Sequence, residues 1–274
     1  MSRKSAFKVG LLILGAYILA ALSSSVITPY SPTALVGRPL DGPSDTHLLG
    51  TNDLGQDIFS RLLYGTRATL IIGLLGALLS VSVSTLVGTV SAYYGGGVDE
   101  VITRSVDVLM TLPSFPLLLV LTIFFAPSIF VISGLMGVLG GMQGIRIIRS
   151  QVLSLVEANF VYGAKAIGAS DLRIMTRHIL PNVLPLATVK FVFAAQRYML
   201  MGVGLGFLGL GDPSVVDWGQ MISRAYYNGG FALGLWWWLI PPGIAVTLLS
   251  IALALLGYGL EEEIYPRLKR SVAI

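Results

Sequence analysis

Long apolar segments with few or no charged residues alternate with short segments that carry most of the charge in this sequence. A helix that crosses a hydrocarbon core about 30 Å thick needs roughly 20 apolar residues at about 1.5 Å each. Four segments meet this requirement, Val9–Ile27, Ala68–Tyr94, Val183–Leu210 and Trp237–Leu256, and the neutral stretch Val108–Ile145 is long enough for two more helices. We therefore predict an all-α polytopic membrane protein with six transmembrane helices.

The turn between the third and fourth predicted helices falls at Ala126-Pro127-Ser128. Proline interrupts the backbone hydrogen bonds of a helix, and serine can satisfy the freed groups locally. The first apolar segment follows Arg3, Lys4 and Lys8, as it would in a signal peptide. It is longer than the apolar part of a typical signal, which favours a retained membrane anchor.

These segments divide the chain into an N-terminal tail with the first helix (residues 1–28), a loop (29–67), a transmembrane core (68–265) and a C-terminal tail (266–274). The core contains a long loop over residues 146–185. Twelve lysines and arginines lie on the side of the two tails and the long loop, and four lie on the other side. Because loops rich in Lys and Arg stay inside, we predict that both termini and the long loop are cytoplasmic.

Of the 274 residues, 54% are hydrophobic and 12% are charged, against about 25% charged residues in a soluble domain. This composition excludes a soluble globular enzyme, a disordered chain and a nucleic-acid-binding protein. The net charge of +4 follows from the orientation of the chain in the membrane. The sequence contains no cysteine, which excludes disulfides, thiolate metal sites and cysteine catalysis.

Two regions are predicted on the outer side of the membrane. One is Thr28–Arg67, which is rich in Pro, Gly and Asp and becomes amphipathic at Asp53–Tyr64, and the other is Gly211–Leu235. The triplet Trp236-Trp237-Trp238 follows the second region. Since indole rings favour the headgroup layer, the triplet indicates a membrane interface; the alternative is a stacking site for a sugar or a peptide.

The cytoplasmic loop 146–185 has the pattern of two short helices. Apolar residues recur at helical spacing and end at a glycine that is typical of a helix C-terminus: Leu153, Val156, Phe160, Ala164, Ile167 and then Gly168. Ser170 and Asp171 are good N-caps for a second helix that runs to His178, and Pro181 is expected to end it before the fifth span. Such a knob suits docking into a groove of another protein; the alternative is a structured but inert loop.

At this loop the sequence resembles the permeases of ATP-binding-cassette importers. Their signature is Glu-Ala-Ala, three residues, Gly, and about ten residues ending in Leu-Pro. Here Tyr162-Gly163-Ala164 departs from the first element, while Gly168 and Leu180-Pro181 match. Further segments are similar to the dipeptide, oligopeptide and nickel permeases in particular: His47–Arg67, Phe207–Gly211 with Trp218-Gly219, Pro241–Gly243, Gly257–Leu260 and Pro266–Leu268.

The resemblance implies the type I importer permease fold in a prokaryotic plasma membrane and a set of partners. These are two ATPase subunits that hold ATP and Mg, a second homologous but not identical permease chain, and an extracytoplasmic solute-binding protein that meets the outer loops. It also implies a coupling helix that docks on the ATPases, formed by Gly168, Ala169, Ser170, Asp171, Leu172 and Arg173. In this interpretation Asp171 caps the helix, Arg173 or Arg177 pairs with an acidic rim, and Ala169 and Leu172 supply affinity.

The chain lacks the motifs of a nucleotide-binding or hydrolytic site. No Gly-x4-Gly-Lys-Ser/Thr, His-Glu-x2-His or Gly-x-Ser-x-Gly occurs. Its two histidines, His47 and His178, are predicted on opposite sides of the membrane, so each is interpreted as an ordinary polar residue. We therefore predict a non-catalytic subunit that binds no cofactor, metal or nucleic acid.

Gln196 and Arg197 are candidates for the translocation pathway, because charged residues inside the membrane face the bundle or a water-filled cavity. Arg197 would meet either an acidic group of the substrate or an acid of the partner chain. Two other classes of function compete with an importer: an ion-coupled secondary transporter, which needs a mid-membrane acid that no predicted span has, and a non-transport scaffold. The substrate is a di- or oligopeptide by resemblance, with nickel complexes and oligosaccharides as alternatives.

Overall fold

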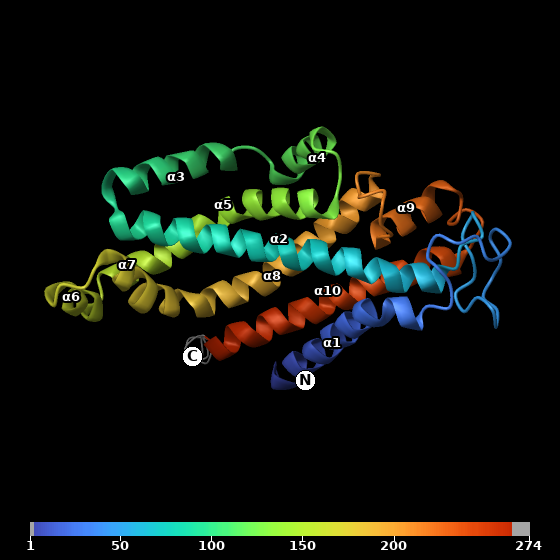
Figure 1. Ribbon diagram of the computed structural model, residues 1–274, viewed down its shortest axis with the longest axis horizontal. Coiled ribbons are helices and arrows are strands. Elements are labelled where there is room, and N and C mark those ends of the chain that lie inside the picture. Colours follow the sequence, from blue (N-terminus) through green and yellow to red (C-terminus); the bar gives the residue numbers. More distant parts are fainter. Residues whose placement is uncertain (1–2, 265–274) are drawn as a thin grey trace, which may run out of the picture.

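The computed structural model describes residues 3–264, which are helical except for connecting loops and one isolated bridge between Thr51 and Asp57. The elements are α1 (Arg3–Ile27), α2 (Ile58–Tyr94), α3 (Gly96–Met110), α4 (Ser114–Phe124), α5 (Ile129–Val156), α6 (Asn159–Ala166), α7 (Asp171–Ile174), the π-helix η1 (Met175–Ile179), α8 (Leu180–Phe207), α9 (Trp218–Tyr227) and α10 (Trp236–Ile264). Figure 1 shows an elongated bundle with α6 and α7 at one end and the loop before α2, together with α9, at the other.

Five described helices are long and apolar enough to cross a membrane, and the pair α3 and α4 adds a sixth span if it counts as one. The fold class is therefore the predicted one, but the third span is not a straight helix that begins at Val108. Counted as one span, the pair begins at Gly96 and bends by 84° between α3 and α4. Pro113 explains the break, because proline disfavours helical geometry in the residue before it. The predicted turn at Ala126-Pro127-Ser128 is confirmed, and Ser128 caps α5.

Close packing of α2 against α5 and α8 forms the centre of the bundle. Small residues permit this approach, as is usual between membrane helices. A Cβ atom added at Gly141 of α5 would lie 2.9 Å from the Val83 Cβ of α2, and one added at Gly73 of α2 would lie 2.9 Å from the Ala195 carbonyl of α8. The helix α1 packs mainly on α10 at the periphery.

The helices extend further into the long loop than the sequence predicted. The helix α5 continues to Val156, so Arg146 and Arg149 belong to it, and the chain then breaks at Glu157 before α6 begins. The single helix predicted through Leu153–Ile167 is therefore wrong. The break allows α6 to turn back and bury its apolar face against the ends of α2 and α5.

Pro181 does not end a helix, contrary to the prediction. The elements α7, η1 and α8 run without interruption from Asp171 to Phe207, with Pro181 at the second position of α8. The wider π turn directly before Pro181 relieves the clash that a proline ring makes with the preceding turn of an α-helix. The second short helix of the loop and the fifth span are thus one continuous helical segment.

At the opposite end, residues 28–57 and α9 form a folded cap. Arg224 Nε of α9 donates to Asp53 Oδ1 at 2.8 Å, and Trp218 Nε1 donates to the Leu62 carbonyl at 2.9 Å. Asp57 caps α2 by accepting from the Ser60 amide. The part of the predicted loop 29–67 that follows Asp57 therefore belongs to α2, and the predicted tail 266–274 lies outside the described residues.

Candidate functional site

The knob, which we define as residues 159–174, has one buried face. Val161, Ala164 and Ile174 pack with apolar residues from the ends of α2 and α5, among them Ala92, Ile148 and Val152. Burying a valine or isoleucine side chain such as that of Val161 or Ile174 stabilises a fold by about 1.5–3 kcal/mol. This face fixes the knob on the bundle.

Gly168 determines how the chain leaves α6. Its φ of +77° lies in the left-handed region that glycine adopts without strain. The Gly168 amide donates to the Lys165 carbonyl at 3.0 Å, and the Ala169 amide donates to the Ala164 carbonyl at 3.1 Å. These two bonds form a Schellman motif, so the predicted helix end at Gly168 is confirmed.

Tyr93, the residue before the last of α2, joins both helices of the knob to the bundle. Its hydroxyl donates to Asp171 Oδ1 at 2.6 Å, and Lys165 Nζ lies 5.3 Å from the centroid of its ring. Asp171 therefore binds a side chain of α2, whereas the N-cap position belongs to Ser170, without a side-chain hydrogen bond. The sequence analysis did not single out Tyr93, because this residue counted only as the apolar end of a predicted span. The signal that could have identified it is the pair of tyrosines directly before three glycines.

The other face of the knob exposes apolar side chains. Ile167 is 85% exposed and Leu172 is 68% exposed, and Tyr162 and Phe160 of α6 are exposed as well. Arg173 is exposed as well, while Ala169 is half-buried and packs against the knob's own core. The sequence predicts Ile167 as the last residue of the apolar repeat of a helix, but α6 ends before it.

The remaining residues of the predicted signature frame this surface. Gly163 is exposed on α6 with free space around it, while Leu180 is half-buried and Pro181 is exposed at the start of α8. The knob thus combines a fixed base with an apolar outer surface. Exposed apolar clusters outside a membrane-spanning segment mark interaction sites.

The two residues predicted for the pathway face different helices. Gln196 Nε2 donates to the Ser250 carbonyl of α10 at 3.1 Å. Arg197 is exposed and donates through Nη1 to Gln143 Oε1 of α5 at 3.1 Å, beside a pocket between α4, α5 and α8. Lys190, seven residues earlier, donates to the Gly144 carbonyl and does not line that pocket.

The histidines and tryptophans lie apart from these places. His47 Nδ1 lies 3.0 Å from Asp57 Oδ1 in the cap, and His178 lies beside the ring of Phe160. The described residues contain no group of three or more side chains suited to a metal ion. Of the tryptophan triplet, Trp236 is exposed, whereas Trp238 is fully buried in the core, so the triplet is not a uniform interface belt.

A bundle of five or six apolar spans with an exposed apolar knob at one end defines a multi-pass membrane protein. The family described as "binding-protein-dependent transport system inner membrane component" matches residues 84–270, and the chain belongs to this family. The match covers the knob and most of the bundle.

Relatives that align with more than nine tenths of the chain carry peptide-transport names. A putative peptide transport system permease protein of Brucella suis is 35% identical over 98% of this chain and 90% of its own. The dipeptide transport system permease proteins DppC of Alkalihalophilus pseudofirmus and Bacillus subtilis are 33% and 32% identical, over 95% and 93% of this chain and 86% and 82% of their own. The chain is thus a permease subunit of an ATP-binding-cassette importer, which decides against a secondary transporter and a scaffold.

Proposed function

We propose that this chain translocates di- or oligopeptides across a prokaryotic plasma membrane, driven by two separate ATPase subunits that bind ATP and Mg and dock on the knob. The names of the relatives support the substrate class. In this proposal the chain itself is non-catalytic and binds no cofactor. The α6–α7 end and both termini are cytoplasmic, and the cap meets a solute-binding protein on the outer side.

The observation that carries the proposal is the exposed apolar surface of the knob on a fixed base. Ile167 and Leu172 offer side chains that gain by burial in a partner. Gly168 sets their direction, and the exposed Arg173 and Arg177 are available for acidic groups around them. We assign the coupling helix to residues 168–173, where polar contacts set the register and the apolar side chains supply most of the affinity.

The continuity of α7, η1 and α8 suggests how work would reach the membrane. A displacement of α7 acts directly on the fifth span, because no flexible loop separates Asp171 from Phe207. Tyr93 and the buried face tie the same segment to α2 and α5, so the ends of three spans move together. Such joint movement of the three spans would let the bundle alternate as a rigid body between two packed states. A second, homologous but different permease chain would complete the translocation pathway. Arg197 would face that pathway.

The test is co-purification of the ATPase subunits with the permease expressed in its complete complex. Leu172→Asp and Ile167→Asp each place a charge where the proposal buries an apolar group, so we expect a loss of roughly tenfold or more in recovered ATPase. The matched control is Leu35→Asp in the cap, a leucine that is 70% exposed. Full recovery of the ATPases with both knob variants would contradict the docking proposal.

A further inference from the structure

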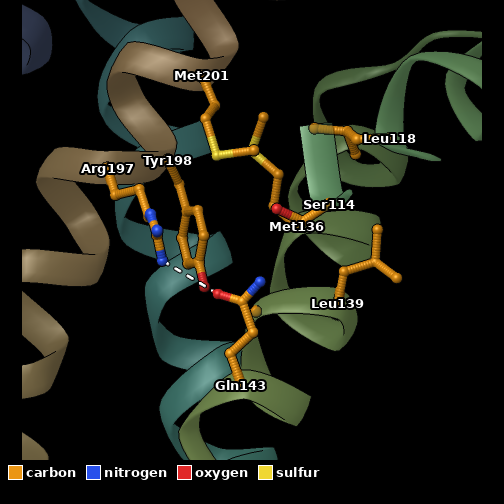
Figure 2. A pocket seen from close by; sticks show the side chains of 9 residues that line it. Ser114, Leu118, Met136, Leu139, Gln143, Arg197, Tyr198 and Met201 are labelled. Carbon is orange, nitrogen blue, oxygen red and sulfur yellow. Dashed lines mark hydrogen bonds between the residues drawn. The ribbon is translucent and has the colours of Figure 1, made fainter. Parts of the chain in front are cut away.

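A groove with mainly apolar walls and a few polar side chains lies between α4, α5 and α8. Its two adjoining pockets share Ser114, Leu139 and Gln143, and Arg197 with Tyr198 forms the wall contributed by α8. Figure 2 shows the Arg197 side chain extended toward Gln143. The guanidinium remains exposed despite this hydrogen bond, so it can reach a molecule in the groove.

Arg197 is a cation well inside the fifth span. Arg197 lies ten residues before Phe207, the last residue of α8, and therefore about 15 Å from that end of the helix. Gln143 lies near the middle of α5. Among residues 3–264 no carboxylate forms an ion pair with Arg197. A cation this far inside a membrane is costly unless it faces water or an anion.

Other features of the groove also favour an anion. Ser114 is the first residue of α4 and lines both pockets, and this helix N-terminus has no side-chain cap. Its first N–H groups and the positive end of its dipole thus border the groove. Methionines contribute to the walls, namely Met110, Met136, Met142 and Met201. Flexible thioether side chains adapt to occupants of different shape.

We propose that Arg197, with Gln143 and the N-terminus of α4, binds the C-terminal carboxylate of a peptide during its passage. The guanidinium gives a carboxylate two charge-assisted hydrogen bonds, and the methionine walls tolerate side chains of any sequence. The inference rests on the proposed function and adds a specificity-determining residue to it. Gln196, whose amide is engaged with Ser250, has no part in this site.

The test compares one peptide in two forms, with a free C-terminal carboxylate and with a C-terminal amide. The complete transporter is reconstituted in vesicles, and each form is supplied at concentrations that load the solute-binding protein equally, as measured by titration. For the unsubstituted complex we expect faster uptake of the free acid. For Arg197→Gln we expect the ratio of free-acid to amide uptake to fall roughly tenfold, a factor that corresponds to about 1.4 kcal/mol, while Arg197→Lys retains part of it.

Lys190→Gln is the matched control, because it removes a cation from the same helix outside the groove. It should leave the uptake ratio unchanged even if total uptake falls. An equal loss of both forms in Arg197→Gln, with less complex recovered, would overturn the inference and assign Arg197 to an ion pair with the second permease chain. An unchanged ratio with normal uptake would overturn it as well. Absence of peptide uptake by the unsubstituted complex would instead overturn the proposed function, and the inference with it.

Discussion

Single residues decide which apolar side chains of the knob are exposed. The left-handed Gly168 turns the chain so that Ile167 is exposed while Ala164 stays buried. Tyr93 then fixes the second helix of the knob by its bond to Asp171. Without these two residues the same apolar side chains could collapse onto one another, and the outer surface would have no defined shape.

Tyr93→Phe tests this role of the knob's anchor. Phenylalanine keeps the ring that packs in the core but removes the donor to Asp171, and loss of a hydrogen bond to a charged group costs roughly 1.5–3 kcal/mol. We expect faster hydrogen exchange in residues 168–174 and weaker stimulation of ATP turnover by substrate. The control is Tyr94→Phe, which alters the exposed neighbour. Equal exchange rates in the two variants would show that the bond does not hold the knob.

The sequence was informative about residues where a local rule applies. Gly168 was predicted as a helix end because a glycine after a helical apolar pattern adopts the left-handed conformation. The pairing of Arg197 with Gln143 joins residues 54 positions apart, and no spacing rule connects them. Gln196 and Arg197 are adjacent in sequence but face different helices. The sequence therefore predicted that both residues lie within a span, but not which helix each side chain faces.

At the scale of elements, the long apolar segments predicted the membrane-spanning helices correctly, whereas the bend between α3 and α4 and the π turn η1 were not predicted. The spans α2, α5, α8 and α10 follow from length and hydropathy. The bend between α3 and α4 lies at Pro113 and the π turn η1 lies directly before Pro181, but the pattern of apolar residues along a segment reveals neither. The short helix α9 was not predicted from the sequence. Asp217 followed three residues later by Gln220 is nevertheless a recognisable start signal of a helix, and Asp217 accepts a hydrogen bond from the Gln220 amide at 2.9 Å.

Asp217 gives the cap a pH-dependent stability. Burial raises the pKa of its carboxyl from 3.8 to about 6, although hydrogen bonds from Gln220 and Gly219 partly offset this. The folded protein therefore holds this proton more tightly than the unfolded chain between about pH 4 and 6. The contribution of Asp217 to stability falls as the pH rises through this window, and the full cost is present above about pH 6.

Asp217→Asn should remove that dependence, because asparagine keeps an oxygen for the Gln220 amide without carrying a charge. We expect the unfolding midpoint of the unsubstituted protein in detergent to rise, relative to the variant, as the pH is lowered from 7 to 5. Thermal unfolding at several pH values measures this difference. If the two proteins keep a constant offset over that range, the carboxyl does not titrate there.

At the scale of the whole molecule, the two ends of the bundle are held by different kinds of contact. The knob rests on buried apolar contacts and exposes others, which suits a moving partner. The cap is held by polar contacts such as Asp53 with Arg224 and is joined to α2 through Asp57. Between them the continuous segment from α7 to α8 connects the knob with the groove at Arg197.

ATP-driven peptide uptake in vesicles that contain the complete complex tests the central claim most directly. With unsubstituted permease we expect uptake against a gradient that requires ATP and both ATPase subunits. With Leu172→Asp, in which a charge occupies the outer surface of the knob, uptake should fall by roughly tenfold or more while the permease stays folded. Accumulation of peptide by this chain in vesicles without ATPase subunits would contradict the account.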